Sequence, residues 1–345
     1  MSGTTDTFEA HLQRFVDSLL RDASGAERPE HEREALIAAA RTMLGRLAPG
    51  GEPLGAPFTP DAAFRPNQVV AGVFTVISLI RRGGLGELYR VRHRELGTDH
   101  ALKTLQPGFS GDADAVALLR NEARLLAMVR HDAVVGGHGL LRDGDGRLVL
   151  VMDFLRGPDL ERTLRDGPME VPQVAALGQR VASGLEAMHR RGIVHQDVSP
   201  GNIVLCDGQP GGATLVDFGL ARLLGDLRSP HDHLEFAGKL SWVSPEQLAH
   251  GAAVDARSDL YSLGLVLAAV AAGEALPMGG DEVVAGRERR RVPPLDSVPT
   301  ALRPVLSRLL QPAASNRPDT AAAAFDMLAE AAAVRPRGFF KRRAP

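Results

Sequence analysis

One group of side chains in this sequence of 345 residues supplies two carboxylates and an amide at close spacing. Asp197 and Asn202 lie five residues apart in the stretch His-Gln-Asp-Val-Ser-Pro-Gly-Asn. Asp217 follows fifteen residues after Asn202 and directly precedes Phe and Gly. One of these groups can accept a hydroxyl proton, while the other two can hold Mg²⁺ against a polyphosphate through their oxygens.

A glycine-rich turn lies closer to the N-terminus, between two β-rich runs, and contains Gly83, Gly84 and Gly86. Glycine allows backbone N–H groups to approach phosphate oxygens that a Cβ atom would block. Lys103 follows on the next β-rich run, and Glu122 lies on an expected helix. A buried lysine needs an anion beside it, so we expect Glu122 to balance Lys103.

The elements that must position these residues form two groups along the chain. Short strands are predicted over 74–80, 88–91, 101–104 and 148–152, and a helix is predicted over 116–129. Helical patterns dominate after the last of these strands. The sequence therefore predicts an α+β fold with a small β-rich lobe followed by a larger helical lobe.

The chain is long for one core, and its ends differ from the middle in composition. Apolar residues at helical spacing over 8–20 and 32–48 predict a helical hairpin, and we assign residues 1–49 to this extension. Its apolar side either packs within the protein or serves a partner or self-association. Residues 50–68 are rich in Gly and Pro and are interpreted as a linker, and residues 333–345 as a basic tail.

Composition excludes several classes of protein. The formal net charge of −2 gives no electrostatic case for nucleic acid as the main partner. A single cysteine, Cys206, cannot form an intramolecular disulfide and suits a reducing cytoplasm. The chain contains no signal-peptide pattern and no apolar run of about 18 residues, so we expect no transmembrane segment and a cytoplasmic location.

Together, these motifs resemble the catalytic core of Hanks-type (eukaryotic-like) bacterial Ser/Thr protein kinases, over residues 69–332. The resemblance implies a two-lobed protein-kinase-like fold, with an N-lobe over 69–155 and a C-lobe over 156–332. It also implies ATP and Mg²⁺ as cofactors and proteins with Ser or Thr as substrates. Three further residues match structural markers of the family: Asp259, and the ion pair of Glu246 with Arg317.

The resemblance assigns roles at the chemical end of the site. Asp197 would orient the substrate hydroxyl and accept its proton, Asn202 and Asp217 would coordinate Mg²⁺, and Lys103 would contact the α- and β-phosphates. His195 matches a packing residue of the family rather than an acid or base. The implied nucleotide-binding set is Gly83, Gly84, Gly86, Leu88, Ala101, Lys103, Glu122, Met152, Asp153, Leu155 and Val204.

Within that set, the resemblance divides the adenine end into three parts. Leu88, Ala101 and Val204 would sandwich the base. Met152 would be the gatekeeper, and the hinge would run from Asp153 to Leu155. The hinge binds adenine through its backbone, so its side chains carry little information.

The sequence departs from the family pattern at four positions. Arg81 replaces the first glycine of the glycine-rich turn. Gln196 replaces the arginine that pairs with an activation-segment phosphate, so we expect no need for that phosphorylation. Ser199 replaces the catalytic-loop lysine, while Lys239 replaces a threonine that touches this lysine in the family. Lys239 is therefore predicted to supply the displaced catalytic cation.

Two alternatives to an active protein kinase stay open at this point. Arg81 and Ser199 suit a pseudokinase scaffold that binds nucleotide or a partner protein without turnover. A small-molecule kinase of the aminoglycoside type also uses the His-x-Asp-x-x-x-x-Asn pattern. That class would not carry the sequence Ser244-Pro245-Glu246 together with Arg317.

Overall fold

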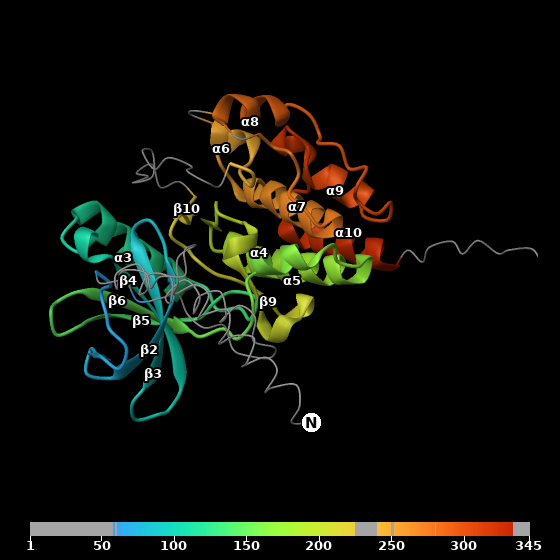
Figure 1. Ribbon diagram of the computed structural model, residues 1–345. Helices are drawn as coiled ribbons and strands as arrows, with labels where there is room; N and C mark the ends of the chain where they lie inside the picture. The colour runs from blue at the N-terminus through green and yellow to red at the C-terminus, as the bar shows by residue number, and fades with distance from the viewer. Residues whose placement is uncertain (1–57, 59–60, 225–239, 250–251, 280, 334–345) are drawn as a thin grey trace, which may run out of the picture.

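The structure of the protein is a computed structural model that describes residues 58, 61–224, 240–249, 252–279 and 281–333. The expected helical hairpin, most of the expected linker, the basic tail beyond 333 and Lys239 lie outside the described residues. The described chain forms a β-rich lobe and a larger helical lobe (Figure 1). The predicted α+β class is confirmed.

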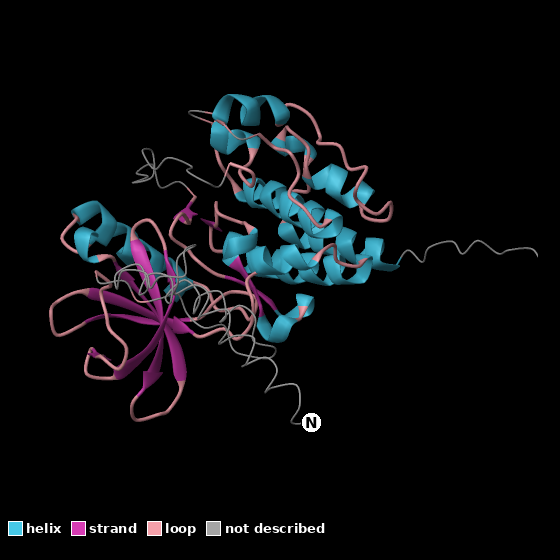
Figure 2. Cartoon of the chain, in the orientation of Figure 1, coloured by secondary structure: helices cyan, strands magenta, loops and turns pink. Residues whose placement is uncertain are grey.

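In the described small lobe, antiparallel pairing joins six strands in the order β1-β2-β3-β4-β6-β5 (Figure 2). Helix α3, Ala113–Met128, packs against this sheet. The strands of the sheet are β1 Val69–Val70, β2 Phe74–Arg82, β3 Gly86–His93, β4 Asp99–Leu105, β5 Gly137–Arg142 and β6 Leu148–Asp153.

The two faces of this sheet have different tasks. Directly opposed residues of antiparallel strands share a face, so Leu88, Lys103 and Leu150 lie on one side of the sheet. Leu150 belongs to the main core that α3 and the helical lobe complete. Tyr89 and Leu102 lie on the other side, in a separate outer core. The first face therefore looks toward the interlobe site.

A segment in front of β1 covers the outer face. Phe64 is fully buried there, and the Ala63 N–H donates to the Glu87 Oε2 atom at 2.8 Å. The carbonyl of Ala63 in turn accepts from the Arg147 side chain at 2.7 Å. Residues 61–68, which the composition assigned to a linker, thus pack as part of the small lobe. Phe64 is the single aromatic residue among these eight, so the composition of the segment did not reveal this anchor.

The helical lobe is built around α7, Ala256–Ala272, which is buried on every side from Ser258 to Ala271. A helix that is apolar all round belongs in the centre of a core. Helices α5, α9 and α10 pack around it. Asp255 caps its first turn, and Gly273 ends it in the left-handed conformation at φ 83°. The other helices are α4 Leu160–Thr163, α5 Val171–His189, α6 Pro245–Leu248, α8 Glu282–Glu288, α9 Arg303–Leu309 and α10 Ala321–Ala333.

Short strand pairs hold the loops at the lobe junction. Strand β7 (Ile193–Val194) pairs with β10 (Arg222–Leu223), and β8 (Ile203–Leu205) pairs with β9 (Ala213–Leu215). The segment between β7 and β8 contains a single 3₁₀ turn, Pro200–Asn202. These pairs bring the His195–Asn202 loop beside the segment that begins at Asp217. Within the described chain, no helix has both the length and the apolarity to span a membrane.

Candidate active site

The loop between β7 and β8 carries the predicted acid–base residue. The Asn202 Nδ2 atom donates to the Asp197 Oδ2 atom at 2.7 Å and to the Asp197 carbonyl at 2.9 Å. Both residues are buried in the structure. Because one amide nitrogen makes both bonds, the amide oxygen of Asn202 remains available to a cation. Ser199, which is also buried, lies on the same loop.

Asp259 of α7 fixes the backbone of this loop. Its two carboxylate oxygens accept from the N–H groups of His195 at 2.9 Å and Gln196 at 2.8 Å. Gln196 has a positive φ of 63°, a conformation that costs free energy in a residue with a side chain. The buried carboxylate offsets that cost. Asp259, which the resemblance includes as a structural marker of the family, therefore anchors the backbone of this loop.

Asp217 follows β9 at a second strained position, with φ 66°. The next residue, Phe218, is fully buried, and its ring lies 5.4 Å from that of His195. His195 is itself buried, and its Nε2 atom lies 3.3 Å from the Val216 carbonyl. These contacts turn the Asp217 carboxylate toward the sheet and confirm His195 as a packing residue.

Lys103 joins the two lobes electrostatically. Its ammonium donates to both oxygens of Glu122, at 2.7 and 2.8 Å, and to the Asp217 Oδ1 atom at 2.8 Å. Burial on its own would lower the pKa of Lys103, but the carboxylates of Asp217 and Glu122 outweigh it and raise that pKa. Lys103 is therefore a fixed cation at neutral pH, held in position by the ion pair that the sequence suggested.

The residues expected around adenine come from both lobes. Ala101 and Met152 are buried, and they lie opposite each other in the sheet on the same face as Lys103. Leu88 and Leu155 are partly buried against the same core. Val204 lies on β8 of the helical lobe and is half-buried. The structure thus places four of these side chains on the small-lobe side of the site and one across from them.

Asp153, at the expected hinge, is held by local bonds. Its carboxylate accepts from the Gly136 N–H at 2.9 Å and lies 2.7 Å from the His138 Nε2 atom. Its own N–H donates to the Gly136 carbonyl at 2.9 Å. This pairing fixes the end of β6 where the chain crosses between the lobes.

The glycine-rich turn is fastened by a residue that the sequence did not suggest. Gln106 donates from its side chain to the carbonyls of Gly83 at 2.5 Å and Gly84 at 3.1 Å. Gly86 is required for close packing, because a Cβ atom there would lie 2.9 Å from the Thr104 carbonyl. The only sequence signal for Gln106 is a polar residue directly after a strand.

Arg81 is the second residue whose placement the sequence did not suggest. Its Nη2 atom lies 3.4 Å from the Asp217 Oδ2 atom, and its Nη1 atom donates to the Gly201 carbonyl at 3.3 Å. The substitution that looked like a defect in the turn therefore brings a cation to the catalytic loop.

The helical lobe carries the expected ion pair. Arg317, with a fully buried side chain, donates to both oxygens of Glu246, at 2.6 and 2.9 Å. Burial opposes ionisation of Glu246, but the bonds from Arg317 and Ser258 lower its pKa below the usual value. A second buried arginine, Arg289, donates to the carbonyls of Val243 and Leu240. These bonds secure the segment that follows residue 239.

The donor set fits a magnesium nucleotide. Asn202 and Asp217 offer amide and carboxylate oxygens on adjoining segments, and Mg²⁺ accepts such ligands while phosphate and water fill its other positions. A site of this type needs only two protein ligands. No cluster of three or more His, Cys, Asp or Glu side chains able to hold a metal occurs among the described residues.

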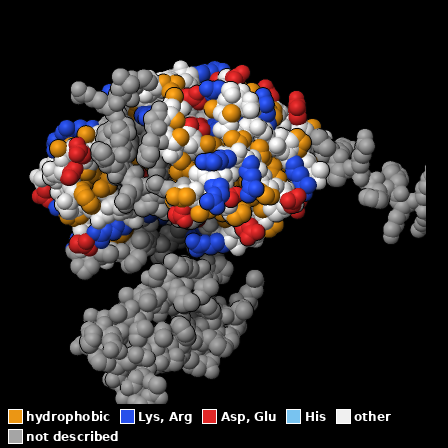
Figure 3. All heavy atoms as spheres, turned by 90° about the horizontal axis from the view of Figure 1, so that it is seen from above, with side chains coloured by type: hydrophobic (Ala, Val, Ile, Leu, Met, Phe, Trp, Pro, Cys, Tyr) orange, Lys and Arg blue, Asp and Glu red, His pale blue; other side chains and the backbone are white. Residues whose placement is uncertain are grey.

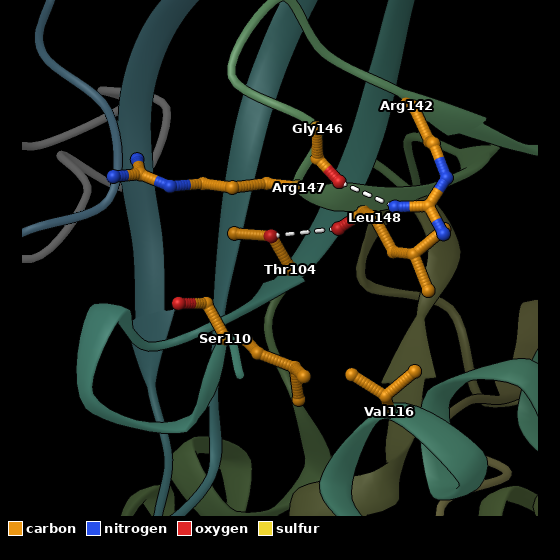
Figure 4. Close-up of a pocket in the computed structure, with 8 residues that line it drawn as sticks. Thr104, Ser110, Val116, Arg142, Gly146, Arg147 and Leu148 are labelled. Atoms are coloured by element: carbon orange, nitrogen blue, oxygen red, sulfur yellow. Dashed lines mark hydrogen bonds between the residues drawn. The ribbon is translucent and has the colours of Figure 1, made fainter. Parts of the chain in front are cut away.

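A small pocket of about 180 Å³ lies elsewhere, on the small lobe (Figure 4). Thr104, Ser110, Val116, Arg142 and Leu148 are among its lining residues. Drug-sized ligands occupy pockets of about 300–1,000 Å³, and none of the predicted catalytic or metal-binding residues lines this one.

On the face shown in Figure 3, acidic and basic side chains both occur over the described surface.

Comparison with known proteins identifies the fold and the family. The family described as "Protein kinase domain" matches residues 74–327 of this chain. The chain belongs to the protein kinase family. The resemblance to Hanks-type bacterial Ser/Thr kinases is thereby confirmed by relatives as well as by motifs.

Two curated relatives of this kinase domain come from bacteria. "Serine/threonine-protein kinase pkn2" of Myxococcus xanthus is 37% identical over 277 residues, covering 77% of this chain and 33% of the relative. "DNA damage-responsive serine/threonine-protein kinase RqkA" of Deinococcus radiodurans is 35% identical, covering 75% and 39%. The match therefore spans well under half the length of these two relatives.

A solved structure shows the same fold. The kinase domain of PknI from Mycobacterium tuberculosis aligns with a TM-score of 0.60 and 28% sequence identity. The alignment covers 78% of this chain and 99% of that domain. The two-lobed arrangement in Figure 1 is thus that of a protein kinase.

Proposed function

We propose that this chain is an active Mg²⁺- and ATP-dependent protein kinase that phosphorylates Ser or Thr in protein substrates. The observation that supports the proposal most strongly is the arrangement of Lys103 between Glu122 and Asp217, with Asp197 and Asn202 on the adjoining loop. A scaffold that never bound nucleotide would have no need for these largely buried charges, each of which is held by another member of the set.

Each residue has a defined task in the proposed reaction. ATP with Mg²⁺ supplies the transferable phosphoryl group and neutralises part of its charge. Lys103 holds the α- and β-phosphates, and Asn202 and Asp217 provide the protein ligands of the metal. Asp197 orients the substrate hydroxyl and takes its proton as the new phosphoester bond forms and ADP leaves. The hydrogen bond from Asn202 keeps the Asp197 carboxylate in place.

The direct test is incubation with γ-labelled ATP, Mg²⁺ and a mixture of Ser-, Thr- and Tyr-containing peptides. Label on Ser or Thr is expected, with sites located by mass spectrometry. ATP binding with no phosphate transfer to peptide, protein or water would instead assign the chain to the pseudokinase class that Arg81 and Ser199 suggested.

The proposal includes activity without activation-segment phosphorylation. Gln196 stands where a phosphate-binding arginine would be, and its carbonyl accepts from the Gln247 side chain at 2.9 Å. A hydrogen bond between two uncharged groups thus joins helix α6, which contains Gln247, to the loop that contains Gln196. Phosphatase-treated protein should transfer phosphate without a lag in a continuous assay. So should Ser229→Ala, which removes the single Ser or Thr that the sequence has between Asp217 and Lys239, at a position outside the described residues. A lag that disappears on preincubation with ATP would contradict this prediction.

The sequence assigned a catalytic role to Lys239 and a cytoplasmic location to the protein. Lys239 lies outside the described residues, so its proposed contact with the γ-phosphate stays a prediction. So does the cytoplasmic location, together with the partner surface proposed for the N-terminal hairpin.

A further inference from the structure

The direction of Arg81 is set by an irregularity in β2. Leu79 pairs with Tyr89, but the next paired residues are Arg81 and Leu88, so β2 advances by two residues while β3 advances by one. Such a β-bulge reorients the side chains that follow it. Because Arg81 is opposed to Leu88, it shares the face of Lys103. Arg82 is opposed to Glu87 and turns to the outer face.

The contacts of Arg81 are weak enough to be exchanged. Its side chain is 47% exposed, and its 3.4 Å separation from Asp217 is long for a hydrogen bond to a carboxylate. Half-exposed ion pairs of this type contribute little to stability. The other carboxylate oxygen of Asp217 already accepts from Lys103 at 2.8 Å. The guanidinium therefore lies at the site and can exchange its present contacts for others.

We propose that Arg81 is a binding residue for the triphosphate of ATP. In this role its guanidinium donates to the terminal phosphates, next to the loop where Ser199 leaves no cation. The inference rests on the proposed kinase function and adds a residue from the opposite lobe to its site.

Charge and geometry both favour this role. The triphosphate keeps a net negative charge after it binds one Mg²⁺, and Lys103 is largely neutralised by Glu122 and Asp217. A planar guanidinium with parallel N–H donors suits phosphate oxygens better than a single carboxylate oxygen at long distance. Binding of Mg²⁺ at Asp217 would also repel the guanidinium from that carboxylate and release it toward the phosphates.

The test compares nucleotide affinities of the full chain by calorimetry, with Mg²⁺ present. Arg81→Ala should weaken ATP binding by about tenfold to a hundredfold, the usual effect of losing hydrogen bonds to a charged group. Adenosine, which has no phosphate, should bind parent and variant within about twofold. Arg81→Lys, which keeps the charge but not the fork, should fall between them.

Arg94→Ala is the matched control, because Arg94 is an exposed arginine of the same lobe whose side chain donates to a loop carbonyl, that of Gly72. It should leave ATP affinity unchanged. An Arg81→Ala variant that binds ATP as tightly as the parent would overturn the inference. Tighter binding would also overturn it and would show that the guanidinium competes with the ligand. Absence of ATP binding by the parent would be a failure of the proposed function itself.

Discussion

Replacing Asp217 with alanine is expected to slow phosphoryl transfer by about 10²–10³ or more, the usual effect of removing an electrostatic stabiliser from such a site. The substitution removes a proposed magnesium ligand and also the carboxylate that holds the Lys103 ammonium at 2.8 Å. Lys103→Ala should have an effect of similar size. Single-turnover measurements with saturating ATP would separate the chemical step from binding.

A surface carboxylate provides the control for this pair of variants. Asp132 forms an ion pair with Arg180 at 2.8 Å, but its side chain is 77% exposed and it belongs to no part of the site. Asp132→Ala should therefore keep the parental rate. Parental turnover in Asp217→Ala or Lys103→Ala would refute the assignment of the catalytic residues.

The largest effect on stability is expected from Arg317→Ala. The guanidinium is fully buried, is bonded to Glu246 at 2.6 Å and stacks 4.8 Å above the Tyr261 ring. It also donates to three backbone carbonyls, of Arg257, Gln311 and Pro312. Removing one partner of a buried ion pair leaves the other charge uncompensated and costs about 3–5 kcal/mol. Urea unfolding of parent and variant would measure the loss.

Arg190→Ala is the corresponding surface control. Arg190 pairs with Glu186 one helical turn away at 2.9 Å, and its side chain is 73% exposed. Exposed pairs of this spacing contribute about 0.3–0.5 kcal/mol. A loss in Arg317→Ala no greater than that in Arg190→Ala would show that the buried pair does not stabilise the helical lobe.

The pH dependence of the Arg317→Ala effect follows from Glu246. Since folding lowers the pKa of Glu246, its ionised form contributes stability that is complete above the pKa of the unfolded chain. That contribution is lost as the pH falls through the lower pKa of the folded state. The difference in unfolding free energy between parent and Arg317→Ala should therefore shrink in acid and be largest near neutral pH.

The sequence predicted the parts of this structure that depend on local pattern. The strands expected over 74–80 and 148–152 lie within β2 and β6, because alternating and continuous β-branched runs are local signals. Strand β5 was missed, since Gly137 and Gly139 weaken a run that only pairing with β6 makes a strand. The Phe64 segment was assigned to the linker for a similar reason, because its partner, Tyr89, lies far away in the sequence.

Some residues of the candidate site could be predicted from the sequence, and others could not. Asp197, Asn202, Asp217 and Lys103 could be found because fixed spacing and order identify them. The direction of Arg81 could not, because it depends on one extra residue in the pairing of β2 with β3. Gln106 was equally hidden, since its partners are backbone carbonyls, which leave no mark in the sequence.

The segment that covers the outer sheet face also links local unfolding to the phosphate-binding end. Asp61 holds Arg82 at 2.9 and 2.6 Å, and Arg82 in turn donates to Gln106, which fastens the glycine-rich turn. Lifting Phe64 out of its core would break this chain of bonds at its first member. An opening of the small lobe that begins at this segment would therefore loosen the glycine-rich turn before it reached Lys103. Opening of the Phe64 segment and nucleotide binding are thus coupled under the proposed function. Bound nucleotide should protect this segment from opening, although the segment lies on the opposite face of the sheet.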